Sequence, residues 1–447
     1  MAMSEASHPA QSELEEIVLR TLALAGRRGA SAAEAGVGVS SGLSVTVRLG
    51  EVETIEYQRD RSLGITVFVG QRKGSASTAN LSASAVEETV TKAMSIASFT
   101  ADDEYAGLPD AALMARDLPD LDLSHPWDIE APEAIALAKR CEAAGLAVDA
   151  RIRNSEGASV STHRKLRVFG NSHGFIGGYP STSHSVSCVV LGQSDGDMQR
   201  DYWYTAARDW RVLEDVEEVG RKAAGKALRR LGAGKLPTRK APVLFAPELA
   251  RGLIGHFVAA IGGTAQYRRS SFLLDAAGQA IFPPGISLIE RPHLRAALGS
   301  APFDGEGVAT RDRDLVVGGV LTGYLLDAYS ARKLGLASTG NAGGVHNLVV
   351  LGEMLDIDAL LRRLGTGLLV TEMMGQGVNP VTGDYSRGAA GFWVENGVVG
   401  RPVHEITVAG NLHDMYRGII ALGDDVDCRG AIHCGSMLIE QMTIAGD

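Results

Sequence analysis

The sequence is poor in cysteine, proline and aromatic residues, and it contains no long apolar run. Four cysteines in 447 residues are too few for the disulfide framework of a secreted scaffold, and they fit a reducing cytosol. No window approaches the roughly 18 uninterrupted apolar residues of a membrane-spanning helix, so none is predicted. With only 15 prolines, the 54 glycines are expected to make most of the tight turns.

Clustered positive charge is also missing. The chain has 43 Lys and Arg against 53 Asp and Glu, and no basic block stands out, which argues against a nucleic-acid partner. The N-terminus, MAMSEASHPAQSELEE, lacks the charged and then apolar pattern of a signal peptide. We therefore expect a cytoplasmic protein with neither nucleic-acid nor membrane partners, in which residues 1–11 form a flexible tail.

The periodicity of the chain predicts an α+β fold. Apolar residues make up 45% of the sequence, enough for two or three domains with real cores. Strand-like alternation is interrupted by helical patterns, without repeating strand–helix–strand units. Ser12 is positioned to cap the first helix, with Glu15 three residues on. Helical spacing of apolar residues recurs at 12–29, 82–96, 131–145 and 212–231.

One segment is the best candidate for a linker. GAGKLPTRKAP (232–242) places glycine, proline and unpaired basic residues between two structured patterns. It predicts an N-terminal α/β domain, 12–232, and a C-terminal β-rich domain, 240–447. The first domain can be divided further, into 12–120 and 125–232. Short helices are expected in the second domain near 357–364 and 411–420.

Two similar motifs lie in the strand-rich part, NSEG at 154–157 and NSHG at 171–174. Asn and Gly tolerate positive φ, so both motifs are typical of hairpin tips. The second lies within GNSHG, which matches the G-x-S-x-G nucleophile elbow. That elbow needs a helix straight after it, and FIGGYPS is a poor helix start, which disfavours Ser172 as a nucleophile. No phosphate-binding glycine motif with the required spacing occurs.

Near the C-terminus, HCG (433–435) follows Cys428 and offers half of a zinc site. A structural zinc needs four ligands, usually as close pairs, and no second pair is visible. Cys434 is therefore better interpreted as a small buried side chain. The nearby acidic run GDDVD (423–427) is most simply a solvated turn.

The stretch PELARGLIGHFVAAI (247–261) predicts a helix that carries a lone histidine. Pro247 suits the first turn, and Glu248 suits the positive end of the helix dipole. His256 falls at the edge of the apolar stripe, while Arg251 points the opposite way. From the residues alone His256 could be a metal ligand, a base or a packed side chain, and a lone histidine on an apolar face is usually packed.

Several long segments resemble the TldD/TldE (PmbA) family, which is linked to peptide-toxin maturation and antitoxin turnover. They include GHFVAAIGG, FDGEGVATRDRDLVVGGVLTGYLLDAYSARKLGLASTGNAGG, GQGVNPVTGDYSRGAAGFWVENG and HCGSMLIEQMTIAG, with NSEGASVS and NSHGF in the first half. The resemblance runs from about residue 12 to the C-terminus. It implies an N-terminal α/β region with an antiparallel sheet and flanking helices, and a C-terminal domain of curved, barrel-like β-sheet.

The TldD-like branch of the family carries H-E-x-x-x-H in this helix and a cysteine far downstream. Its histidines and cysteine hold zinc, and its glutamate acts as base. Here RGLIGH places Arg251 at the first histidine and Gly252 at the glutamate, and only His256 remains. A permanent positive charge would repel a metal, and glycine cannot take a proton from water. The chain therefore resembles the TldE/PmbA branch.

Helix geometry adds a second expectation. Positions five apart sit about 140° apart on a regular helix, so the metal-binding branch must distort it. In this chain Gly252 and Gly255 could permit such a bend, or they could allow close packing.

The resemblance implies a subunit without zinc or another cofactor of its own, within a TldD–TldE-type heteromeric metallopeptidase. The TldD-like partner would supply zinc, and a homodimer could form without it. The substrates implied are unfolded peptides and small flexible proteins. The glycine-rich GQGVNPVTGDYSRGAAG (375–391) is a candidate wall of the peptide groove, and a plain hairpin with a wide turn is the alternative. The substrate-binding candidates are Asn379, Thr382, Asp384 and Tyr385.

Two other interpretations stay open. One is an autonomous peptidase or hydrolase with a nonstandard site, in which His256 works with Cys434 or an acidic residue. The other is a non-enzymatic modulator that holds a peptide or a gyrase-targeting toxin.

Overall fold

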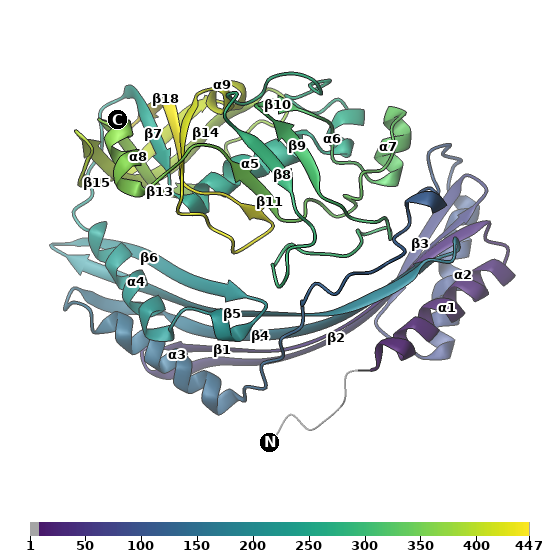
Figure 1. The fold of residues 1–447 in the computed structure, drawn as a ribbon. Coiled ribbons are helices and arrows are strands. Elements are labelled where there is room, and N and C mark those ends of the chain that lie inside the picture. Colours follow the sequence, from purple (N-terminus) through teal and green to yellow (C-terminus); the bar gives the residue numbers. More distant parts are fainter. Residues whose placement is uncertain (1–8, 447) are drawn as a thin grey trace.

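The computed structural model describes residues 9–446, which form two β-rich halves (Figure 1). The first half is a long curved sheet, and the second half lies on its concave side. This arrangement confirms the α+β prediction and the barrel-like C-terminal sheet. The tail predicted for 1–11 lies outside the described residues except at 9–11, where the first helix already begins at Gln11.

The first half is built on a six-stranded antiparallel sheet in the order β3-β2-β1-β4-β5-β6. Along β1, buried and partly exposed residues alternate, as a strand with one covered face requires. Leu49 and Gly50 have φ values of 50° and 79° and make the tight β1–β2 turn. The strands are β1 (Ala32–Arg48), β2 (Glu51–Val69), β3 (Arg72–Thr78), β4 (Ile152–Asn171), β5 (Ile176–Ser194) and β6 (Asp197–Ala207).

Four helices pack against this sheet in two pairs, one pair at each end (Figure 1). Glycines allow the second pair to approach closely, because a Cβ on Gly220 of α4 would lie 2.0 Å from the carbonyl oxygen of Cys141 in α3. The helices are α1 (Gln11–Arg27), α2 (Ala83–Phe99), α3 (Ala131–Leu146) and α4 (Val216–Arg229), with short 3-10 turns at Ala111–Leu113 and Trp210–Val212.

Three local predictions in this half were wrong. Ala10, not Ser12, is the N-cap of α1, and it makes no side-chain cap. The helix predicted from residue 212 begins at Val216, because the Asp215 side chain caps it there. The NSEG motif is not a hairpin tip. It lies inside β4, where the register shifts and Gly157 has a φ of 115°. The NSHG motif does form the turn between β4 and β5.

The outer edge of β2 is uncovered over much of its length. Within the described chain, β3 pairs only with Leu63–Val69 of β2, so residues 51–62 are paired on the β1 side alone. Every residue of this segment is exposed, including Ile55 and Tyr57. An unpaired edge of this length is a template for pairing with another strand.

The second half contains a closed five-stranded barrel of β7, β13, β14, β15 and β18, which belongs to a seven-stranded sheet. The barrel closes at β7, which pairs parallel with β13 and antiparallel with β18. The strands of this sheet are β7 (Arg239–Phe245), β12 (Met354–Leu355), β13 (Gly367–Met374), β14 (Asp384–Glu395), β15 (Val398–Asn411), β16 (Ile419–Gly423) and β18 (Met437–Ala445).

A second sheet and five helices complete this half. The sheet runs β10-β9-β8-β11-β17, with β8 (Ser287–Glu290), β9 (Arg313–Val317), β10 (Val320–Leu321), β11 (Leu348–Leu351) and β17 (Ile432–His433). The helices are α5 (Pro247–Ala260), α6 (Gly263–Tyr267), α7 (Ala328–Leu334), α8 (Ile357–Leu364) and α9 (Leu412–Arg417). The last two match the short helices expected in this region. No helix between residues 9 and 446 combines the length and apolarity needed to cross a membrane.

The largest core of the molecule surrounds α5. This helix contributes Leu253, Ile254 and Phe257, all buried, and they pack with residues of both C-terminal sheets. Burying one such side chain stabilises the fold by roughly 1.5–3 kcal/mol. The core thus fixes α5 in place, and its remaining faces are presented to the neighbouring segments in defined orientations.

Candidate functional site

The N-terminal part of α5 faces a compact ion-pair cluster. Arg251 Nη1 lies 3.2 Å from Asp427 Oδ2, and Arg251 Nη2 donates to the Tyr204 hydroxyl at 3.5 Å. Arg429 Nε donates to Asp427 Oδ1 at 2.9 Å, and its Nη1 donates to the Tyr204 carbonyl at 2.6 Å. Arg251, Asp427 and Arg429 are called the Asp427 cluster below. One carboxylate thus joins two arginines, and the bonds of these arginines to Tyr204 tie α5 to β6.

Asp427 corrects the interpretation of GDDVD as a solvated turn. Asp424 and Asp425 are exposed, but Asp427 is only 6% exposed. Burial alone would raise the pKa of Asp427. Hydrogen bonds from Arg429 and the charges of Arg251 and Arg429 outweigh this effect, so the pKa lies below its usual value. The carboxylate therefore stays ionised at neutral pH and offsets part of the positive charge of its two arginines.

His433 and Cys434 lie next to this cluster in the sequence and are both buried. The burial of Cys434 agrees with its interpretation as a core residue. It raises the pKa of the thiol to about 12, and the thiol donates to the Gly435 carbonyl at 3.1 Å. Such a thiol stays protonated at neutral pH, which does not suit a nucleophile. Burial also lowers the pKa of His433, whose Nε2 has no hydrogen-bond partner within residues 9–446.

The side chains on this face of α5 do not fit a zinc site of the TldD type. Arg251 is a cation at the place of the first histidine, and Gly252 has no side chain at the place of the glutamate. In the part of the chain that the structure describes, no three His, Cys, Asp or Glu side chains cluster so that they could hold a metal ion. A catalytic zinc requires three such ligands and an open position.

His256 contacts different neighbours from Arg251. Its ring meets the ring of Tyr385 edge-on, with centroids 6.2 Å apart and planes at 75°. Burial lowers the pKa of His256, and the charge of Arg387 lowers it further. The structure therefore does not bring His256, the one remaining motif residue, into one site with Arg251, which stands at the position of the first histidine. His256 is a neutral side chain packed beside an aromatic ring.

The two glycines of RGLIGH have neither of the roles considered for them. α5 runs as a regular α-helix from Pro247 to Ala260, without a bulge. A Cβ added at Gly252 or Gly255 would meet nothing within 4 Å. The glycines thus neither bend this helix nor allow close packing, and we have no physical explanation for them in this chain.

Three of the four predicted substrate-binding residues bond to one another in the β13–β14 connection. The Asn379 side chain accepts from two backbone N–H groups of its own loop. Thr382 Oγ1 donates to Asp384 Oδ2 at 2.6 Å, and Asn411 Nδ2 donates to Asp384 Oδ1 at 3.2 Å. Tyr385 is 2% exposed, and burial raises the pKa of its hydroxyl. Their contacts maintain a turn, and a role in peptide binding stays a prediction.

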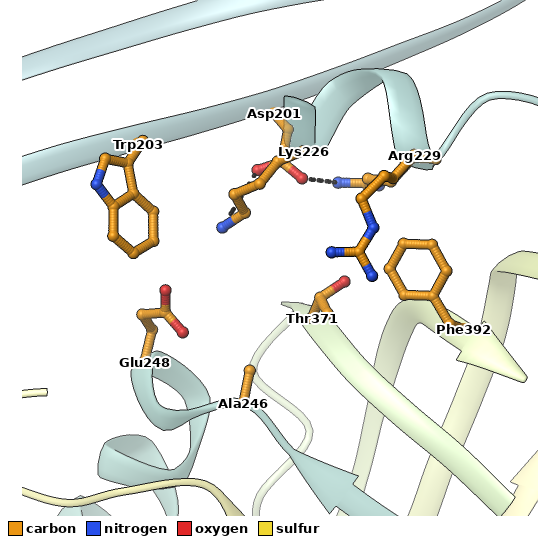
Figure 2. Close-up of a pocket in the computed structure, with 9 residues that line it drawn as sticks. Asp201, Trp203, Lys226, Arg229, Ala246, Glu248, Thr371 and Phe392 are labelled. Carbon is orange, nitrogen blue, oxygen red and sulfur yellow. Dashed lines mark hydrogen bonds and ion pairs between the residues drawn. The ribbon is translucent and has the colours of Figure 1, made fainter. Parts of the chain in front are cut away.

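A cavity of about 180 Å³ opens between the two halves of the chain (Figure 2). Two residues of its lining, Trp203 and Glu248, contact Arg429 of the Asp427 cluster. A second cavity of about 150 Å³ adjoins the first along β6 and shares much of its lining. The walls of the first come from β6, α4, β13, β14 and the start of α5. They are formed by Asp201, Trp203, Lys226, Arg229, Arg230, Ala246, Glu248, Thr371 and Phe392.

Trp203 connects this cavity to the Asp427 cluster. The guanidinium carbon of Arg429 lies 4.5 Å from the Trp203 ring centroid, and the Lys226 ammonium lies 5.2 Å from it. Each such contact contributes about 0.5–1 kcal/mol at an exposed site. Glu248 Oε1 lies 3.6 Å from Arg429 Nη2. The wall of the cavity is therefore held by the same arginine that pairs with Asp427.

The sequence analysis missed this cavity. Its residues lie in segments that are far apart in the sequence, and only the packing of α4 against β6 and of β6 beside α5 brings them together. One signal was available. The run DYWY (201–204) places three aromatic residues together in a chain with few of them, and the cationic end of α4, KALRR, follows.

The chain matches known proteins over nearly its whole length. Sequence models of the PmbA/TldA metallopeptidases match at 33–97 (domain 1), 124–231 (central domain) and 238–446 (C-terminal domain). The chain is 52% identical to the "Metalloprotease PmbA" of Escherichia coli O157:H7, over 97% of this chain and 96% of that relative.

Solved structures give the same result. A protein of Bacteroides thetaiotaomicron VPI-5482 described as a modulator of DNA gyrase matches with a TM-score of 0.92 and 28% identity, over 97% of this chain and 99% of that one. TldE from Thermococcus kodakarensis shares the fold, with a TM-score of 0.85 and 20% identity over 98% and 100% of the two chains. The chain therefore belongs to the PmbA/TldD metallopeptidase family, in its PmbA/TldE branch.

Proposed function

We propose that this chain is the non-catalytic, PmbA/TldE-type subunit of a heteromeric metallopeptidase in the cytoplasm. A TldD-like partner supplies the zinc and the catalytic base, and this chain holds no metal of its own and contributes part of the peptide groove. The substrates are unfolded peptides and small flexible proteins. The observation that carries the proposal is the ion pair of Arg251 with Asp427 at the position of a zinc-binding histidine.

The Asp427 cluster disfavours a metal ion for a second reason besides the missing histidine ligand, namely its positive charge. A guanidinium keeps its positive charge at any physiological pH. A metal ion placed beside Arg251 and Arg429 would meet like charges, and two unit charges 4 Å apart repel by about 4 kcal/mol at an effective dielectric constant near 20. The only carboxylate in the cluster, Asp427, already has two cationic partners. This arrangement favours a structural role for Arg251, which stands where the TldD-like branch has a zinc-binding histidine.

The uncovered edge of β2 supports assembly with a second subunit. If two such edges pair antiparallel about Glu56, then Glu53 faces Arg59 and Glu51 faces Arg61, while the two copies of Glu56 face each other at a cost. Opposite charges facing each other across strands contribute roughly 0.2–1 kcal/mol per pair. In the absence of the partner, a homodimer of this chain would form these ion pairs. A TldD-like chain with a similar strand could replace one of the two copies.

The proposal is tested by measuring zinc content and peptide cleavage of the purified chain, alone and mixed with a TldD-like subunit. We expect no stoichiometric zinc and no cleavage by the chain alone, and more cleavage by the mixture than by the partner alone. A partner in which the motif glutamate is changed to glutamine is the control, and its mixture should be inactive. Chelator-sensitive cleavage by this chain alone would overturn the proposal.

A non-enzymatic peptide-binding modulator is the second candidate, and the cavity beside Trp203 favours it. In that case the mixture binds peptide without exceeding the cleavage rate of the partner. The autonomous hydrolase is less well supported, because the Cys434 thiol is buried and its pKa is raised to about 12.

A further inference from the structure

The charges around the cavity do not balance. Pairing is complete for all the cations but one. Lys226 and Arg230 contact Asp201, Arg230 also contacts Glu372, Arg251 and Arg429 share Asp427, and Arg429 also contacts Glu248. The remaining cation is Arg229, which makes no ion pair with any described residue and packs its guanidinium 4.8 Å from the Phe392 ring centroid. The cavity thus has one uncompensated positive charge in a chain whose net charge is −10.

A hydroxyl without a partner lies opposite this guanidinium. Thr371 Oγ1 is buried and, within residues 9–446, has no hydrogen-bond partner. Figure 2 shows the Arg229 side chain extending from α4 toward Thr371, with Phe392 beside it. Leaving a buried hydroxyl unsatisfied costs about 1–3 kcal/mol, so such a group usually has a ligand or an ordered water.

The backbone explains why Thr371 has this orientation. The register between β13 and β14 shifts between Val370 and Glu372, so Thr371 is the extra residue of a bulge. Bulges often redirect a side chain next to a binding site. The first turn of α5 also lines the cavity through Ala246 and Glu248, and its N-cap, Ala246, provides no side-chain cap. The positive end of the helix dipole therefore favours an anion here.

From these three observations we propose that the cavity binds a carboxylate of a peptide. Arg229 supplies the charge, the Thr371 hydroxyl donates a hydrogen bond, and Phe392 and Trp203 flank the carbon atoms next to the carboxylate. One uncompensated cation matches one negative charge. A cavity volume of about 180 Å³ suits an acidic side chain or a C-terminal residue. The inference rests on the proposed function only in taking a peptide as the ligand.

The test measures binding rather than cleavage, so it can fail independently of the proposed function. The probes are acetyl-trialanine with a free C-terminal carboxylate, its C-terminal amide, and the amide of acetyl-Ala-Glu-Ala. Binding to the full chain is followed by calorimetry and by the change in tryptophan fluorescence. We expect the first or the third probe to bind at least tenfold more tightly than the uncharged amide, and to weaken as salt is added. The tighter of the two identifies the source of the carboxylate.

Two variants and a control complete the test. Arg229→Gln should weaken binding of the carboxylate probe about tenfold and leave binding of the uncharged amide unchanged. Thr371→Val should weaken the same binding severalfold without loss of folding, because it removes a group that has no partner in the free chain. Arg221→Gln is the matched control, since Arg221 is exposed on the same helix and does not line the cavity. Equal affinity for the acid and the uncharged amide, or equal binding by Arg229→Gln and Arg221→Gln, would overturn the proposal.

Discussion

Two polar clusters lie between the halves of this chain, and they differ in how completely their groups are paired. In the Asp427 cluster each arginine has the carboxylate within 3.2 Å and bonds to Tyr204, which ties the two halves together, although Arg251 Nη1 makes an ion pair without a hydrogen bond. In the cavity beside it, the buried Thr371 hydroxyl has no hydrogen-bond partner among the described residues, and the exposed Arg229 makes no ion pair with them. The difference teaches that charges which pair with one another can tie the two halves together, while a neighbouring cavity leaves a cation and a buried hydroxyl without a partner in the described chain.

The largest effect is expected from Asp427→Ala, because it leaves two arginines without their carboxylate. Breaking a buried ion pair costs about 3–5 kcal/mol, and we expect about 3 kcal/mol here because both arginines are partly exposed. Thermal and urea unfolding measure the loss. Asp424→Ala, in the same segment but exposed, is the control and should change little. Similar midpoints for the two variants would mean that the cluster is not structural.

The lowered pKa of Asp427 also predicts how the stability of the fold changes in acid. Because the folded pKa of Asp427 is lowered, its contribution is complete above the unfolded value near 3.8 and is lost as the pH falls through the folded pKa. Asp427→Asn should therefore lose less stability than the unchanged chain in that acidic range. An identical slope of stability against pH in both proteins would contradict this assignment.

A smaller loss of stability is expected when the motif is restored by Arg251→His and Gly252→Glu together. The double variant keeps the Arg429–Asp427 pair but loses the Arg251 pair, which we expect to cost about 1–2 kcal/mol. It should not gain zinc-dependent cleavage, because the supporting contacts around a metal site also matter and because His256 faces Tyr385. Metal analysis and a peptide assay check this. Stoichiometric zinc with new cleavage would show that the site was only superficially lost.

Glu306 extends the comparison to an unpaired carboxylate. Burial, and then the charges of Asp304, Asp327 and Glu34, raise its pKa to about 7. The folded chain then holds this proton more tightly than the unfolded chain, so stability falls as pH rises from 4.5 to about 7. Glu306→Gln should remove that loss, raising stability above pH 7 by about 1–2 kcal/mol.

The control for this variant is Glu353→Gln, which changes a carboxylate that is 70% exposed. Unfolding is compared at pH 5 and pH 8 for both variants. The quantity compared is the free energy of unfolding of each variant relative to the unchanged chain. If this difference rises no more from pH 5 to pH 8 for Glu306→Gln than for Glu353→Gln, the raised pKa of Glu306 is refuted.

The smallest stability effect is expected for Thr371→Val. The buried hydroxyl has no partner in the free chain, so its removal should change the free energy of unfolding by less than about 0.5 kcal/mol, or increase it. Thr162→Val is the comparison, since Thr162 Oγ1 is bonded to His184 Nδ1 at 2.9 Å. A larger loss at Thr371 than at Thr162 would imply a bond that keeps Thr371 satisfied inside the fold.

Patterns within one element could be predicted from the sequence, and patterns between elements could not. The hairpin at NSHG followed from turn chemistry. The similar NSEG lies at a bulge in mid-strand, because pairing with β5 overrides the local preference for a turn. Arg251 was identified from its motif, but Asp427 was interpreted as solvated because nothing in GDDVD indicates two arginines nearby. Arg229 and Thr371 come from different halves of the chain, so only tertiary packing makes them neighbours.

The pairing of β7 with β18 also sets an order of events during synthesis. The N-terminal sheet is assembled from successive hairpins, so most of its strands gain a partner soon after they are made. β7 obtains β13 and β18 only after much or nearly all of the second half has been translated. Contacts between such distant segments form slowly, and an open barrel edge can meanwhile capture strands from other chains. The nascent C-terminal half is therefore the part of this protein that depends most on protection from aggregation before its barrel closes.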